Sequence, residues 1–142
     1  MKVGPLLAHL HVLEEALSAE LRAAAERHRD DHDVYHQCHT FAVTADKRVQ
    51  ALGPLEQRYE GKPIWSTAVG AGSSDLLEDL RMLYLRSQET AITWVMAAQA
   101  AKAARDKELL SLATESQTET ELQAKWFTTR IKTGAPQALV VG

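Results

Sequence analysis

The sequence predicts an all-α protein, a four-helix bundle made of two antiparallel helix hairpins that a longer linker joins. Leucine and alanine recur every three or four residues through most of the 142 positions, which is the spacing of amphipathic helices. No segment shows the alternation that marks a half-buried strand. A short polar turn joins the two helices of each pair, and one glycine-rich segment separates the two pairs.

The first hairpin is predicted at residues 4–29 and 32–59. Its first helix carries a stripe of Leu6, Leu10, Leu13, Leu17, Leu21 and Ala24. The acidic turn at residues 30–33 can cap the second helix, and because it is short we expect antiparallel neighbours. Within the second helix, Gly53 and Pro54 predict a kink or a stop, since proline removes a helical hydrogen bond.

The linker at residues 61–74 has three glycines, one proline and no helical period. Its length allows two routes, either along the whole bundle or around a loop at one end. The second hairpin is predicted at residues 75–104 and 107–132. Its buried stripes include Ile92 in the first helix and Leu122 in the second.

The ends of the second hairpin carry recognisable signals. Asp75 and Glu78 have the spacing of a capping box at its start. Gly134 followed by Pro136 predicts that its last helix stops there, because glycine often ends a helix and proline cannot continue one. An apolar tail, residues 135–142, follows the predicted stop.

Composition limits the possible functions. Apolar residues make up 45% and charged residues 25%, as in a globular protein, so we expect one domain over residues 1–142. The net charge is −3 and the basic residues are scattered, so we expect no nucleic-acid partner. No stretch approaches the ~20 apolar residues of a membrane span, and no signal peptide is recognisable, so a cytoplasmic location is expected. The single cysteine, Cys38, lies on a predicted buried stripe and is expected to be a core residue.

Five carboxylates are predicted on or beside the inward stripes near the middle of the bundle: Glu14, Asp46, Glu89, Glu115 and Glu119. Buried carboxylates are costly without partners, and metal ions are one kind of partner. A di-metal bundle, however, uses Glu-x-x-His on two helices. That motif is absent, and all six histidines lie at or before position 39. We therefore expect no catalytic residues and no cofactor. The carboxylates are expected to pair with Lys, Arg or Thr or to face water. The alternative is that they bind a transition metal ion such as iron.

The turn between the first two helices is a second candidate metal site. His28, His32 and His36 bracket it, among several aspartates. Imidazole with carboxylate suits zinc, nickel or copper, and histidine also titrates near neutral pH. The alternative interpretation is a solvated, hydrogen-bonded end of the bundle.

The tail suggests an interaction surface. Residues 138–141 (ALVV) are apolar and follow the predicted helix stop. They either fold back beside Trp126 and Ile131 or dock on another subunit or protein partner. Docking on a second copy predicts a homo-oligomer, most simply a two-fold dimer.

The two hairpins, the mid-bundle carboxylates and the linker resemble the ferritin-like superfamily. The stretch DVYHQCHT at residues 33–40 and the ending RIK at 130–132 with APQALVV at 135–141 also look like small ferritin-like bundles without an assigned activity. The resemblance implies a ligand set of Glu14, Glu89, either Glu115 or Glu119, and Asp46 in place of a glutamate. Without the ligand histidines, it implies a bundle that is not an enzyme and acts through self-association or partner interaction. A metal-binding bundle is the alternative function, and a small-ligand carrier is the third.

Overall fold

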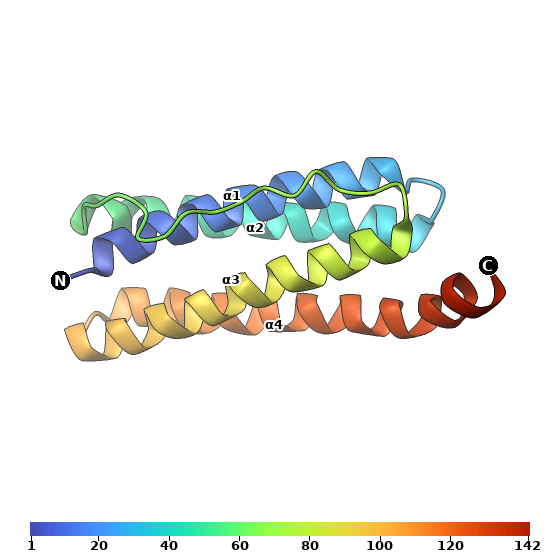
Figure 1. The fold of residues 1–142 in the computed structure, drawn as a ribbon. Helices are drawn as coiled ribbons and strands as arrows, with labels where there is room; N and C mark the ends of the chain where they lie inside the picture. Colours follow the sequence, from blue (N-terminus) through green and yellow to red (C-terminus); the bar gives the residue numbers. More distant parts are fainter.

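The computed structural model describes all 142 residues and contains four long helices and no strand, which confirms the predicted all-α fold. The helices are α1 (Val3–Arg27), α2 (His32–Arg58), α3 (Leu76–Ala104) and α4 (Lys107–Pro136), and α4 continues into a π-helical turn, η1 (Gln137–Val141). Figure 1 shows α1 paired with α2 and α3 paired with α4. The pairs join mainly where α1 packs on α3, and α2 touches α4 only lightly. None of the helices combines the length and the apolar character that crossing a bilayer requires.

The linker takes the long route. In Figure 1 it leaves the end of α2 and runs along the whole of α1 before α3 begins. Near the start of α1, the Ile64 N–H donates to the Pro5 carbonyl at 3.1 Å. Near the end of α1, the Gly72 backbone, at a φ of +80°, lies directly against the Arg27 guanidinium, where a Cβ would clash. The bundle therefore has one long crossover, and α2 and α3 run in the same direction.

Aspartates cap three of the helices, as the acidic turns suggest. Asp31, Asp75 and Asp106 each accept a hydrogen bond from a backbone N–H two or three residues later. The expected capping box at α3 is modified. Ser73 Oγ accepts the Asp75 N–H at 3.0 Å and donates to Glu78 at 3.1 Å, so the serine bridges the two box residues.

The predicted helix stop at Gly134 and Pro136 is wrong. α4 continues through both residues, and Pro136 has helical angles of φ −59° and ψ −43°. α2 likewise continues through Gly53 and Pro54 to Arg58. A glycine ends a helix when it adopts positive φ, and neither Gly53 nor Gly134 does so. A glycine one or two residues before a proline is therefore not enough to stop these two helices.

The core is apolar towards both ends and polar in the middle of α3 and α4. The apolar clusters include Leu7, Leu52 and Leu109 at one end and Leu21, Val34 and Phe127 at the other. The middle is filled by Ser87, Thr90, Ser116, Thr120 and Gln123. Ile92 and Leu122, predicted to be buried, are instead 53% and 62% exposed. The hydroxyl groups are tolerated inside because most bond to a carbonyl four residues back, as Ser87 does to Leu83 at 2.7 Å.

The tail does not cover the bundle. Leu139, Val140 and Val141 are 74%, 83% and 73% exposed. Of the two alternatives for the tail, the structure therefore does not show the one in which it folds back beside Trp126 and Ile131. Figure 1 shows the end of the chain reaching beyond the turn that joins α1 to α2. Docking of the tail on another chain stays a prediction.

Candidate functional site

Glu14 is the centre of a polar cluster in the middle of the bundle. Its side chain, on the inward face of α1, is fully buried. Arg48 of α2, also buried, donates to both carboxylate oxygens, through Nε to Oε2 and through Nη2 to Oε1 at 3.0 Å. The indole N–H of Trp94 in α3 donates to Oε2 at 2.9 Å. Three helices therefore meet at one carboxylate, and charged or N–H donors satisfy both of its oxygens.

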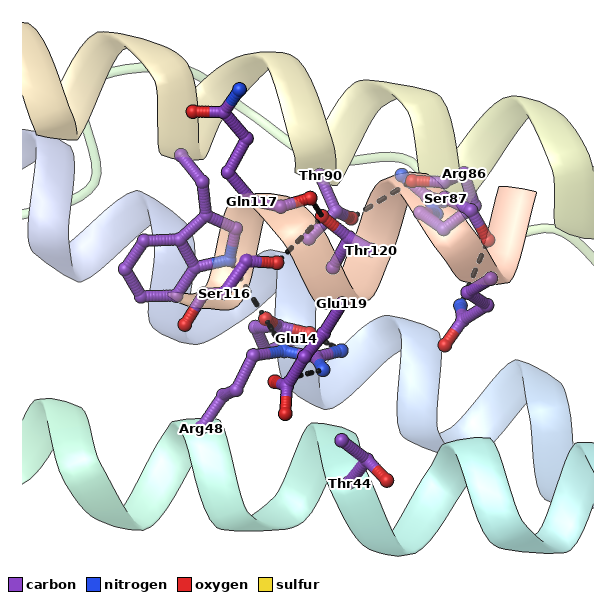
Figure 2. A network of polar contacts seen from close by, with 12 residues as sticks. Glu14, Thr44, Arg48, Arg86, Ser87, Thr90, Ser116, Gln117, Glu119 and Thr120 are labelled. Atoms are coloured by element: carbon purple, nitrogen blue, oxygen red, sulfur yellow. Dashed lines mark hydrogen bonds and ion pairs between the residues drawn. The ribbon is translucent and has the colours of Figure 1, made fainter. Parts of the chain in front are cut away.

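Arg48 also reaches the fourth helix. Its Nη1 donates to Glu119 Oε1 at 3.2 Å, and Figure 2 shows the guanidinium lying between Glu14 and Glu119. Burial alone would lower the pKa of Arg48, but hydrogen bonds to the two carboxylates and their negative charge raise it above its ordinary value. The arginine is therefore a fixed positive charge among the mid-bundle carboxylates.

The other three predicted carboxylates lie elsewhere. Asp46 is half-exposed and binds Arg22 and Ser18, each at 2.6 Å; the hydrogen bond from Arg22 is the main reason that its pKa is lowered. Glu89 is exposed and pairs with Arg86 at 2.7 Å. Glu115 is exposed on the groove between α2 and α4. The structure thus brings together Glu14 and Glu119, and Arg48 stands between them.

These residues do not fit a dinuclear metal centre. No group of three or more histidine, cysteine, aspartate or glutamate side chains converges on one point. The oxygens of Glu14 face the Arg48 guanidinium and the Trp94 N–H, which compete with any cation for them. A metal ion placed there would also meet a buried positive charge at short range.

The histidines of the first turn point in different directions. His28 is buried, and its Nε2 lies 2.6 Å from Asp79 Oδ2 at the start of α3. Asp79, also buried, accepts from Arg27 Nε at 2.9 Å and from the Ser73 N–H at 2.8 Å. His32 and His36 are exposed on α2 instead. His28 therefore belongs to a cluster that fastens α1, the crossover and α3 at one end of the bundle, and the three histidines do not share one site.

Cys38 lies inside the apolar cluster near that end. Burial, together with the negative charges of Asp79 and Asp31, raises the pKa of its thiol to about 12. The thiol is therefore protonated near neutral pH and is a poor nucleophile. This agrees with the core role that its place on the stripe suggests.

Several hollows lie on the surface of the bundle, and three of them concern the candidate sites and the tail. A hollow of about 210 Å³ lies between α1, the crossover and α3, beside Glu20 and Asp79. Another, of about 230 Å³, lies in the groove between α2 and α4, beside Arg48. A third, of about 300 Å³ and largely apolar, lies at the foot of the tail and is lined by Leu76 and Leu80 among others. A small-ligand carrier stays a prediction.

Sequence reasoning missed Arg48, which decides the character of the centre. The spacing contained a signal, because Arg48 lies three residues after Ala45 and four before Leu52, two residues of the buried stripe. The neighbouring apolar residue, Val49, is only half-buried. A carboxylate on the inward stripe of α1 calls for a cation on a facing helix, and the arginine supplies it.

Comparison with protein-family models, curated proteins and solved structures finds no match for this chain. The basis for assigning a function is therefore the set of contacts and exposed surfaces within the chain itself.

Proposed function

We propose that this chain is a ferritin-like helical bundle without dinuclear chemistry and that it acts by self-association, as a two-fold dimer. The topology supports the ferritin-like assignment, because ferritin-like folds combine two helix hairpins with one long crossover. Here the crossover at residues 61–74 connects the two hairpins along the length of α1.

The contacts of Glu14 favour a role without catalysis at the centre. The carboxylate is engaged by Arg48 and Trp94, so a guanidinium stands where a di-metal bundle would place its ions. The contacts among Glu14, Arg48 and Trp94 link α1, α2 and α3. The hydrogen bonds of the Glu14–Arg48 pair are satisfied within the protein, which makes the pair a structural element rather than an open reaction site.

The observation that carries the proposal of self-association is the exposed apolar tail. Leu139, Val140 and Val141 project from the end of α4 with most of their surface in water. A second apolar surface, the α3 stripe, is defined as Leu85, Ile92 and Met96, which are exposed on the outer face of α3. Monomers rarely expose contiguous apolar patches without using them, and a two-fold contact is the commonest closed arrangement.

Sedimentation equilibrium of the full chain tests this function. We expect a mass of two chains at micromolar concentration. Replacing the α3 stripe with Leu85→Gln and Ile92→Gln, or the tail with Leu139→Ser, Val140→Ser and Val141→Ser, separates the two surfaces. A wild-type chain that stays monomeric at tens of micromolar contradicts the proposal.

A further inference from the structure

We propose that the tail of each chain docks into the apolar hollow at the foot of the tail of a second copy, reciprocally across a two-fold axis. This inference rests on the proposed self-association and names the surfaces that carry it. We call the hollow the end pocket and define it by Leu76, Leu77 and Leu80 of α3 and by Gly134 and Ala138 at the end of the chain.

The end pocket is built to receive an apolar segment. Its volume is about 300 Å³, and three leucines of the first turns of α3 form one wall. Gly134 of α4 also lines the pocket and leaves open space, since an added Cβ would meet no atom within 4 Å. The leucine wall is only partly covered by its own chain, because Leu76 and Leu77 are half-exposed.

The occupant is expected to be apolar and to carry no acidic side chain. Asp31, Asp75 and Arg130 line the pocket; Arg130 pairs with Asp31 at 2.7 Å, whereas no cation pairs with Asp75, so an acidic segment or an anionic lipid surface is disfavoured there. Residues 133–142 carry no charged side chain, and Leu139, Val140 and Val141 offer the apolar surface that the pocket lacks. The tail thus offers the pocket apolar surface and brings no charged side chain to it.

A second copy is the occupant because the tail cannot fill its own pocket in this conformation. η1 continues directly from α4, and its three large side chains face water. Ala138 is part of the pocket wall, so tail and pocket are neighbours at one end of the molecule. A two-fold axis that relates two copies places the tail of each copy over the pocket of the other. The assembly is then complete with two chains.

A mixing experiment tests the reciprocal contact. The tail variant carries Leu139→Ser, Val140→Ser and Val141→Ser, and the pocket variant carries Gly134→Phe, which fills the pocket from its open wall. We expect the mass of each variant alone to fall from two chains to one. We expect an equimolar mixture to form a heterodimer, seen by native mass spectrometry, because one intact tail then meets one intact pocket.

The other outcomes are distinct. A wild-type dimer that survives the tail substitutions overturns the docking but leaves self-association through the α3 stripe standing. Two monomeric variants that fail to form a heterodimer exclude the end pocket as the receptor. A monomeric wild type overturns the proposed function as well, and tail-dependent binding to neutral lipid vesicles would then assign the tail to a membrane surface. Circular dichroism of each variant well below its melting temperature, expected to show the helix content of the wild type, controls for folding.

Discussion

Arg48 is a buried cation whose main task is to satisfy Glu14. Taking the two charges out of water is expensive, and their bidentate contact with the added Trp94 hydrogen bond offsets that cost. The sequence shows why a charged pair is required, since Glu14 lies on a stripe of leucines. The sequence does not show which basic residue pairs with Glu14, because Arg48 is 34 residues away and reaches Glu14 only once α1 and α2 are packed.

Removing the cation should destabilise the bundle strongly. For Arg48→Met we expect the free energy of unfolding to fall by about 3–5 kcal/mol, because Glu14 is left buried without a counter-charge. Adding Glu14→Gln should recover part of the loss, since no buried charge then remains. Urea unfolding measures both.

The matched control is Arg22→Met. Arg22 makes a similar contact with Asp46 at 2.6 Å, but both side chains are substantially exposed. We expect this change to cost about 0–1 kcal/mol. If Arg22→Met and Arg48→Met lower the free energy of unfolding equally, the buried Glu14–Arg48 pair stabilises the fold no more than an exposed pair does.

His11 should give stability a dependence on pH. Burial alone lowers its pKa, but hydrogen bonds and charge from Glu56 and Glu15 outweigh burial and raise it above the ordinary 6.5. A raised pKa in the folded state means that the contribution is fully present below pH 6.5 and is lost as the pH rises through the raised value. Urea unfolding on both sides of pH 6.5 should show this decline, and His11→Gln should remove it. His32→Gln, at an exposed histidine, should leave the decline intact.

At the scale of elements, the helices follow from the periodicity of the sequence, but their ends follow from backbone conformation. The starts are predictable because Asp31, Asp75 and Asp106 are local caps. The end of α4 is not, because Gly134 is compatible with both a stop and a continuing helix. Nothing local to Gly134 or Pro136 distinguishes the two.

Gly134→Ala tests whether α4 continues. In a helix with open space at Cβ, alanine should raise the free energy of unfolding by about 0.5–1 kcal/mol, because glycine loses more backbone freedom on folding. A helix that ended at Gly134 with positive φ would instead be weakened by alanine. The control is Gly72→Ala, where a φ of +80° and the adjacent Arg27 predict destabilisation. Thermal unfolding of the two variants makes the comparison.

The inward faces were harder to predict than the helices. The leucine pattern placed Leu122 inside and left Ser116 and Thr120 unassigned, whereas the structure buries the two hydroxyl residues. Thr120 donates to the Ser116 carbonyl at 2.9 Å, so its burial costs little. A pattern based on hydrophobicity alone cannot detect polar groups that are satisfied within their own helix.

At the scale of the whole molecule, the route of the crossover sets the topology. Its length allows either route, and contacts between distant parts of the chain select one. At one end of the crossover, the Ile64 N–H donates to the Pro5 carbonyl. At the other end, the Asp79 carboxylate contacts Arg27, His28 and the Ser73 N–H. Between these two ends, hydrogen bonds link Glu14, Arg48, Trp94 and Glu119, which belong to four different helices.

The Glu14–Arg48 ion pair lies in the middle of the bundle, and in the proposed function it takes the place of a dinuclear metal centre. Elemental analysis of dialysed, untagged protein after incubation with iron(II) and air, with visible absorption recorded alongside, tests this role. We expect no stoichiometric iron and no ferric charge-transfer band, because Arg48 and Trp94 already bond to the oxygens of Glu14. Two irons retained per chain, together with that band, would contradict the role of the ion pair.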